Sequence, residues 1–256
     1  MEILVCIKRV PGASGRITLT DDAQAVDARY VGYTLSPHEE CAVELAVQTV
    51  EANGGSATVL SIGVEETLEQ MREALSVGLS AGVLVEADPS TWAPGDVAAA
   101  IAEVVRTQGQ AGKTYDLLLF GNEAADTGDA QVGIGVAVRL GLPCVTGVTS
   151  FEIVDQRAVA RRDGRDGAEI FETPLPSVLT IREGAIIPRY PSLPGRIKAK
   201  RAPVERFTPS ITPVGNGRLR LTVPPEAPST VDVLGTGAEA APAAVDLIER
   251  LGLVSQ

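Results

Sequence analysis

The stretch best suited to chemistry is a loop rich in glycine and carboxylates, residues 121–133 (GNEAADTGDAQVG). It follows the apolar run Asp116–Phe120, a predicted buried strand, and leads into a helix predicted to continue through Leu140. Loops at the carboxyl ends of strands are where open α/β sheets bind ligands. Gly121 and Gly128 permit close backbone approach, and the helix start offers unpaired N–H groups to an anion. The loop is therefore a candidate nucleotide site.

Two carboxylates limit how an anion could bind in this loop. Asp126 and Asp129 can each cap the following helix or accept a ribose hydroxyl, but neither is expected to face a phosphate directly. A loop that only caps the helix is the alternative, and the residues by themselves leave both interpretations open.

A second helix start lies at Ser36-Pro37-His38-Glu39. Ser36 can cap the helix, Pro37 suits its first turn, and Glu39 completes an S-x-x-E capping box. Capping alone would explain all four residues. His38 is the only histidine of the chain, and we expect a surface histidine beside the cap rather than a catalytic one.

Other sites of known chemistry are missing from the sequence. The pair Gly133-x-Gly135 is not completed by a third glycine, because position 138 is Val138, so no dinucleotide fingerprint is present. There is no G-x-x-x-x-G-K-[ST] motif and no Cys/His cluster with metal-ligand spacing. We expect no catalytic residues, no metal and no turnover by this chain alone.

The net charge and the cysteine content exclude some classes of binding partner and indicate a cellular compartment. The net charge of −11 argues against nucleic acid and against an anionic membrane surface. No apolar run is long enough to span a bilayer, and the first residues enter a strand directly, which favours a chain without a leader segment. The three cysteines, Cys6, Cys41 and Cys144, lack C-x-x-C spacing and favour the reducing cytoplasm.

The elements that must position these residues alternate between strand and helix. Scarce aromatics, 4% of the residues, imply a core of Val, Leu, Ile and Ala. Alternation of this kind predicts a doubly wound α/β fold with a mostly parallel sheet over residues 1–145. The predicted strands are Ile3–Ile7, Ala57–Ile62, Gly82–Val85 and Asp116–Phe120, and the predicted helices are Pro37–Ala52, Glu65–Leu79 and Gly95–Thr107.

The pattern changes from about Val148. Short strands joined by turn signals are expected to form antiparallel additions at one edge of the sheet. They are Phe151–Val154, Arg157–Arg161, Glu169–Thr173 and Ser177–Ile181. Pro209–Thr236 is predicted to be an extended arm, and Ala238–Leu251 a final amphipathic helix whose regular part begins near Pro242. That helix can pack on a partner subunit or on its own domain.

Four segments, in order, resemble the electron transfer flavoprotein beta subunits. Met1–Pro11 is similar to their N-terminal strand and K-R/Q-V-P turn, and Ser36–Glu44 to their N-P-x-x-x-x-A-V-E segment. The loop 121–133 is similar to their G-x-x-A-x-D…Q-x-G loop, and Pro188–Lys200 to their P-R-Y-x-S-L-P…K-A-K segment. The ordered set covers most of the chain, which makes the resemblance specific.

The resemblance implies a Rossmann-like adenine-nucleotide-binding domain over residues 1–208 and a C-terminal arm, 209–256, that packs on an alpha subunit. It implies a heterodimer in which the alpha subunit holds most of the FAD, while this chain holds AMP and supplies one wall near the flavin from Val10–Ser14. The implied nucleotide contacts are Cys6, Ser36, Pro37, His38, Glu39, Ile62, Gly121, Asn122, Glu123, Ala124, Ala125, Asp126, Thr127, Gly128, Asp129, Ala130, Gln131 and Val132.

A recognition loop at residues 184–200 is also implied, in which Tyr190, Leu193 and Pro194 dock partner dehydrogenases. Prolines pre-order such a loop and lower the entropy cost of docking an apolar anchor. The alternative is that Leu193 packs on its own domain. We expect the basic residues that follow, Lys198, Lys200 and Arg201, to form a face exposed to solvent.

Two departures from the family pattern leave the nucleotide open. Ser36 replaces the usual Asn and cannot supply its amide, and the loop Ala125-Asp126-Thr127-Gly128-Asp129 is rearranged and less bulky than the common A-I-D-[DG]-D. The sequence Ala130-Gln131-Val132-Gly133 occurs also in electron-bifurcating members, which hold a second FAD in place of AMP and oxidise NADH. A stand-alone nucleotide-binding module, working as a homodimer, is the third possibility.

Overall fold

Strand β1 (Glu2–Ile7) lies in the middle of the molecule and is buried along almost its whole length. Its side chains alternate between two cores, as the pleat of a strand requires. Ile3, Val5 and Ile7 face helices on one side of the sheet, whereas Leu4 and Cys6 face helices on the other. The structure is a computed structural model that describes residues 1–12, 17–27, 29, 31–225 and 231–254.

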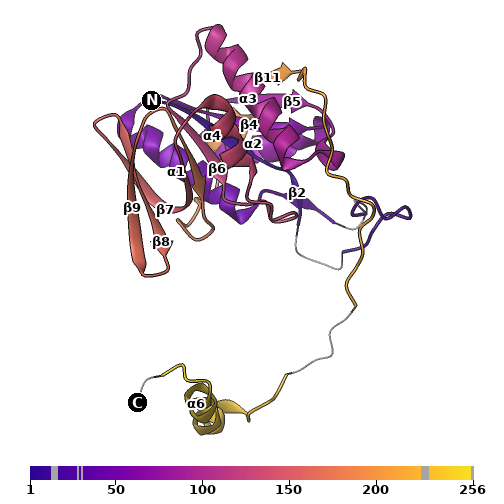
Figure 1. Cartoon of the computed structure of the whole chain (residues 1–256), viewed down its shortest axis with the longest axis vertical. Coiled ribbons are helices and arrows are strands. Elements are labelled where there is room, and N and C mark those ends of the chain that lie inside the picture. Colours follow the sequence, from indigo (N-terminus) through magenta and orange to yellow (C-terminus); the bar gives the residue numbers. More distant parts are fainter. Residues whose placement is uncertain (13–16, 28, 30, 226–230, 255–256) are drawn as a thin grey trace. The chain divides into compact units, whose positions relative to one another are not determined.

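Within the described residues, nine strands form the main sheet (Figure 1). They are β1, β4 (Ser56–Gly63), β5 (Ala81–Glu86), β6 (Leu117–Gly121), β7 (Cys144–Val154), β8 (Arg157–Gly164), β9 (Gly167–Pro174), β10 (Ser177–Ile181) and β11 (Val204–Phe207). Their order is β11-β5-β4-β1-β6-β10-β7-β8-β9. Neighbours from β11 to β7 are parallel, and β7, β8 and β9 are antiparallel. The predicted mostly parallel sheet with antiparallel additions is confirmed.

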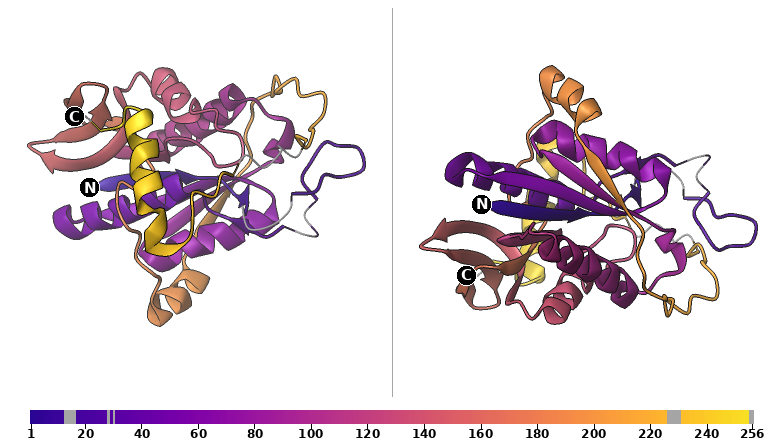
Figure 2. Two further views of the ribbon diagram at one scale, coloured as in Figure 1. Left: turned by 90° about the horizontal axis from the view of Figure 1, so that it is seen from below. Right: turned by 90° about the horizontal axis from the view of Figure 1, so that it is seen from above.

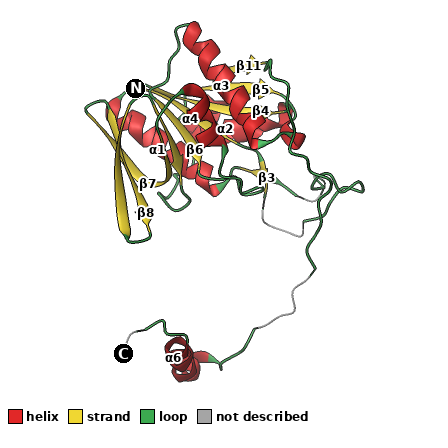
Figure 3. Cartoon of the chain, in the orientation of Figure 1, coloured by secondary structure: helices red, strands yellow, loops and turns green. Residues whose placement is uncertain are grey.

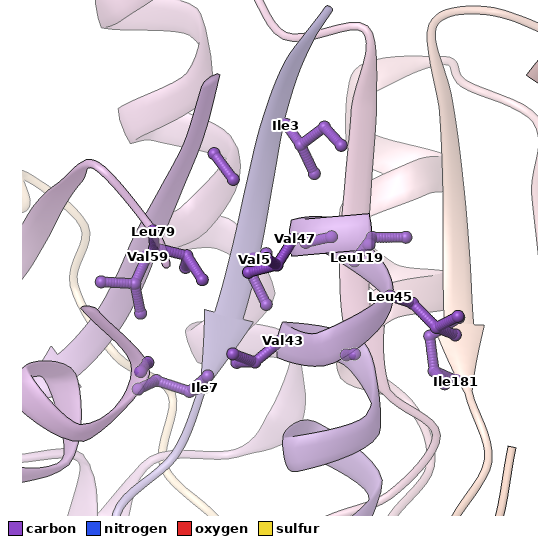
Figure 4. Close-up of a cluster of buried hydrophobic side chains, with 14 of the residues drawn as sticks. Ile3, Val5, Ile7, Val43, Leu45, Val47, Val59, Leu79, Leu119 and Ile181 are labelled. Atoms are coloured by element: carbon purple, nitrogen blue, oxygen red, sulfur yellow. The ribbon is translucent and has the colours of Figure 1, made fainter. Parts of the chain in front are cut away.

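Helices cover both faces of this sheet, as a doubly wound fold requires (Figures 2 and 3). They are α1 (Pro37–Asn53), α2 (Leu68–Val77), α3 (Pro94–Gln110), α4 (Val132–Leu140) and α5 (Leu193–Arg201), with short helical turns η1 (Glu65–Thr67) and η2 (Pro89–Thr91). Residues of α1, α2 and α5 pack in one core, and residues of α3 and α4 in the other. Figure 4 shows Val43 and Val47 of α1 beside Val5 of β1.

The prediction for Ser177–Ile181 was wrong in place and direction. This segment is β10, which lies inside the sheet between β6 and β7 and is parallel to both. Every one of its five residues is buried. A short run flanked by turns suggested an edge strand, but a continuous apolar run is what a strand covered on both faces requires. Only β7, β8 and β9 form the antiparallel addition.

Two further strand pairings were not predicted. β11 adds a parallel edge strand beside β5. β2 (Val10–Pro11) and β3 (Tyr33–Thr34) form a small antiparallel pair directly after β1, with the Arg9 guanidinium stacked 3.4 Å from the centre of the Tyr33 ring. β2 and β3 have only two residues each, too few to show a strand pattern, and β11 has four residues with two charged ones in its middle.

The first part of the predicted arm is fixed to the body of the protein. Residues 209–221, the strap, run along α3 from its carboxyl half to its first turn and reach the loop that contains Ala23. Glu103 and Asp96 of α3 accept hydrogen bonds from the strap. The donors are Ser210 to Glu103, and the backbone N–H groups of Val214 and Gly215 to Asp96, each of the last two at 2.9 Å.

The chain divides into two units, Met1–Thr222 and Val223–Gln256. The second unit contains the turn η3 (Gly237–Ala240) and helix α6 (Ala241–Arg250), which has Pro242 in its first turn as predicted. The apolar positions Val245, Ile248 and Leu251 of this unit are exposed. No helix in the described part of the chain is both long and apolar enough to cross a membrane.

Candidate functional site

The order of the sheet reverses between β1 and β6. From β1 the chain winds outward through α1 and α2 to β4 and β5, and then returns along α3 to β6 on the other side of β1. Parallel strands on either side of such a switch point leave a crevice beyond their carboxyl ends. The predicted loop 121–131 begins at this rim, directly after β6.

Residue 121, at the end of β6, must be a glycine because the start of α1 approaches it closely. A methyl group there would lie 2.8 Å from Cγ and 3.1 Å from the backbone N of Glu39, and 3.1 Å from Cβ of His38. Any side chain at residue 121 would therefore push the start of α1 away from β6. This contact places the two predicted segments, residues 36–39 and 121–131, against each other.

One half of the predicted capping box at the start of α1 is formed, since Glu39 accepts from the Ser36 backbone while the Ser36 side chain makes no cap hydrogen bond to the helix. The Ser36 backbone N–H donates to Oε2 of Glu39 at 3.3 Å, and the Ser36 hydroxyl donates to the Glu123 carbonyl at 3.3 Å. Pro37 is exposed in the first turn of α1. Ser36 thus links the start of α1 to the glycine-rich loop. This contact could not be predicted from the fact that residue 36 is a serine.

Asn122 uses its side-chain oxygen and its backbone N–H in hydrogen bonds to neighbouring strands of the sheet. Its Oδ1 accepts from the Gly147 N–H at 2.9 Å and from the Thr180 hydroxyl at 2.8 Å, and its own N–H donates to the Ile181 carbonyl at 2.7 Å. These bonds tie β6 to β10 and β7 at the rim. The Asn122 side chain therefore fixes the base of the loop to the sheet, and its Oδ1 is not free to bind a ligand.

The remainder of the loop projects into solvent. Residues 125–131 are exposed, and Gly128 (φ 62°) and Ala130 (φ 51°) adopt left-handed backbone conformations that let the loop curl. The Gly128 N–H closes a turn onto the Ala124 carbonyl at 2.9 Å. Helix α4 then begins at Val132 with its first-turn N–H groups free of partners within the helix. This part of the loop is open to a ligand.

Cys6 and Ile62 are not in the open part of the rim. Their residues are 5% and 8% exposed and pack with Leu4 and Phe120 in the core that faces α3 and α4. Burial, together with the charge of Glu39, raises the pKa of the Cys6 thiol well above its ordinary value, so the group stays neutral. The two residues form an apolar floor at the ends of β1 and β4.

An ion pair that the sequence did not predict joins the segment after β1 to the loop after β6. Lys8, directly after β1, places its Nζ 2.7 Å from Oδ1 of Asp126 in the loop after β6. Beneath it, Glu39 is 5% exposed, and burial raises its pKa to about 8, against the lowering effect of the Lys8 and Ser36 N–H groups and the Lys8 charge. The sequence contained one sign of this ion pair, namely a lysine directly after the first strand and a loop rich in carboxylates after another.

His38 is not the surface histidine that was expected. Its side chain is only 12% exposed. Nδ1 accepts the Glu183 backbone N–H at 2.8 Å, and Nε2 lies 3.6 Å from Oε1 of Glu123. The ring therefore joins three segments, which are the start of α1, the loop after β6 and the residues after β10.

The segment after β10 is anchored to α1 through two motif residues. Arg189 donates to both carboxylate oxygens of Glu44, at 2.9 and 3.0 Å, and also binds Glu51. Glu44 is 2% exposed, and although burial alone would raise its pKa, the bonds from Arg189 hold the pKa below its ordinary value. Sequence motifs contained both residues but gave no sign that they pair.

The predicted recognition loop ends in a helix. Ser192 caps α5, and Leu193 is its first residue, followed by Pro194 in the first turn. Tyr190 and Leu193 are 96% and 73% exposed, so Leu193 does not pack on its own domain. Of the turn predicted to face the flavin, Val10 and Pro11 form β2, whereas Ala13 and Ser14 lie outside the described residues.

Comparison with known proteins decides the family. A family model described as "Electron transfer flavoprotein domain" matches residues 25–212. "Electron transfer flavoprotein subunit beta" of Bacillus subtilis (strain 168) is 34% identical over 208 residues, which are 81% of this chain and 79% of that protein. The chain belongs to the electron transfer flavoprotein beta subunit family.

Relatives of this electron transfer flavoprotein chain carry other names as well. "Caffeyl-CoA reductase-Etf complex subunit CarD" of Acetobacterium woodii is 32% identical over 209 residues, 80% of this chain and 77% of that protein. "Protein FixA" of Rhizobium meliloti (strain 1021) is 31% identical over 216 residues, 81% of this chain and 72% of that protein. Family membership assigns the chain a role in flavin-based electron transfer, with FAD in the complex in which it works.

Proposed function

We propose that this chain is the beta subunit of a heterodimeric electron transfer flavoprotein of the cytoplasm. An alpha subunit holds most of the FAD, which takes electrons from dehydrogenases and passes them to a membrane-linked quinone reductase or another acceptor. The present chain supplies a rigid base, a bound AMP and a docking surface, and has no turnover of its own. The observation that carries the proposal is that the loop 121–131, the start of α1 and Lys8 meet at the switch point of the sheet.

The donor set of this crevice fits a nucleoside monophosphate. The first-turn N–H groups of α4 suit a phosphate, and carboxylates such as Asp129 suit ribose hydroxyls. The apolar floor of Cys6 and Ile62 suits the face of a base. FAD, when bound to the heterodimer, supplies the reversible uptake of electrons, and this chain orients and shields it.

A second candidate is the electron-bifurcating beta subunit, with a second FAD in the crevice in place of AMP. The sequence Ala130-Gln131-Val132-Gly133 at the start of α4 favours it, as does the similarity to the caffeyl-CoA reductase complex subunit. We place AMP first because the resemblance to the family implies AMP in this chain.

The nucleotide content of the heterodimer tests both candidates. The chain is co-expressed with an alpha subunit, and the nucleotides released on denaturation are quantified. One FAD and one AMP per heterodimer are expected. Two FAD, with flavin reduction by NADH, would replace the first candidate by the second. A stable homodimer with no flavin and no affinity for an alpha subunit would refute both and favour a stand-alone module.

The docking surface consists of the exposed side chains of Tyr190 and Leu193 at the start of α5. The Arg189–Glu44 pair fixes the backbone just before them, which lowers the entropy cost of docking a dehydrogenase. Leu193→Ala is expected to slow electron transfer from a dehydrogenase at least tenfold, by the usual cost of losing a docking anchor. Val138→Ala is the control, because Val138 on α4 is similarly exposed, at 75%. Equal rates for both variants would remove the docking role.

A further inference from the structure

The ion pair between Lys8 and Asp126 is not held in place by packing. The two side chains are 39% and 25% exposed, and their 2.7 Å contact joins residues 118 positions apart in the sequence. Pairs in such an environment contribute about 0–1 kcal/mol of stability. Lysine is a point charge on a flexible stem, so its ammonium can move between acceptors without rearranging the backbone.

The surroundings of this pair are acidic. Glu123 and Asp129 belong to the same loop as Asp126. A nucleotide phosphate adds further negative charge, about −1.5 to −2 at neutral pH. At the start of α4 this charge would be repelled by Asp126 unless a cation came between them. Lys8 is the cation that the fold places there.

We propose that Lys8 is a phosphate-binding residue, and that Asp126 holds its ammonium in the ligand-free crevice and exchanges it for the phosphate of the nucleotide. This inference rests on the proposed nucleotide site and deepens it. Asp126 then works against binding, because it competes with the phosphate for the same ammonium. Lys8 confers preference for a phosphorylated nucleotide over a nucleoside, since an ammonium group pairs with the charge of the phosphate.

The two residues must therefore have opposite effects on affinity. Lys8→Met removes a charge-assisted hydrogen bond and should weaken AMP binding about tenfold to a hundredfold. It should leave the weak binding of adenosine unchanged. Asp126→Asn frees the ammonium and should strengthen AMP binding about threefold, roughly the strength of an exposed ion pair. In the Lys8→Met background the Asp126→Asn gain should disappear, since no ammonium remains to be freed.

The experiment measures AMP and adenosine affinity by titration calorimetry on the heterodimer, freed of nucleotide by dialysis. Lys198→Met on α5 and Asp166→Asn in the turn between β8 and β9 are the matched controls, because both side chains are exposed and lie outside the proposed nucleotide site. Both controls should leave the AMP affinity close to that of the parent chain, in the wild-type and in the Lys8→Met background. Unfolding temperatures of all variants establish that the chains are folded.

Three results separate the possibilities. If Lys8→Met and Asp126→Asn both weaken AMP and adenosine alike, the pair merely ties the loop, and the inference is wrong. An unchanged AMP affinity in Lys8→Met overturns it as well. If the wild-type heterodimer takes up no AMP at all, the nucleotide part of the proposed function fails, whereas the first two results leave that function intact.

Discussion

Replacing Glu39 by glutamine should stabilise the folded chain, and the gain should grow as the pH rises. Glu39 is 5% exposed at the rim, and burial raises its pKa from 4.5 to about 8. The folded chain therefore keeps a proton on this carboxyl that the unfolded chain releases above pH 4.5. The stability linked to this proton is fully present below pH 4.5 and is lost as the pH rises through about 8.

The size of the effect follows from the displacement of the pKa. One unit corresponds to about 1.36 kcal/mol, so at pH 7 the wild type has lost about 3 kcal/mol that it had at low pH, whereas at pH 5 it has lost only about 1 kcal/mol. Glutamine has no proton to lose, and its Oε1 can still accept the Ser36 N–H. The difference between variant and wild type should therefore widen by about 2 to 3 kcal/mol from pH 5 to pH 7, or about 5–10 °C in unfolding temperature.

Urea denaturation of wild type and Glu39→Gln between pH 5 and pH 8 measures this difference directly. Glu66→Gln controls for the exchange of a carboxyl for an amide, because Glu66 is exposed on η1. A stability difference between Glu39→Gln and wild type that stays constant over this pH range would refute the reasoning, since it would show that the folded and unfolded chains bind the same number of protons at residue 39.

Three other substitutions test the supports of the site. Gly121→Ala should cost about 1–3 kcal/mol in chemical denaturation and lower AMP retention, because the new methyl would lie 2.8 Å from Cγ of Glu39. Arg189→Met should cost about 2 kcal/mol at neutral pH and less near pH 4, since it leaves Glu44 buried without its partner while Arg189 itself is 36% exposed. Asp96→Asn should cost about 1–2 kcal/mol and make the strap the first segment cut in limited proteolysis, because it weakens the acceptor of two strap N–H groups.

Each of these predictions has a result that contradicts it. For Gly121→Ala it is wild-type stability together with full AMP content. For Arg189→Met it is a loss of stability that does not change with pH, and for Asp96→Asn it is a strap that resists protease as in the wild type.

Sequence pattern was sufficient where local chemistry decides the structure. The strands near residues 3–7 and 116–120 and the helix that starts at Ser36 were predicted because apolar period and capping residues act over a few neighbours. The place of Ser177–Ile181 could not be predicted, because strand order depends on partners 60 residues away, Leu117 among them. Pairs such as Lys8 with Asp126 likewise join distant segments.

The strap shows a different limit. Its composition is that of a linker, rich in Pro, Gly, Ser and Thr, and nothing in its own residues requires a fixed path. The path is set by Asp96, a residue of α3 that accepts the strap's backbone N–H groups. Backbone donors are present in every non-proline residue, so their use leaves no trace in a sequence.

The position of β10 has a consequence for biogenesis. Its neighbours β6 and β7 both precede it in the chain, yet they are separated in the sheet by the width of β10 itself. A growing polypeptide that ends before residue 181 cannot pair these two strands in their final places, and must leave a gap or hold them apart. The half of the sheet from β5 to β6 can assemble while translation continues, whereas the β7–β9 blade can only be joined to it after β10 has emerged from the ribosome.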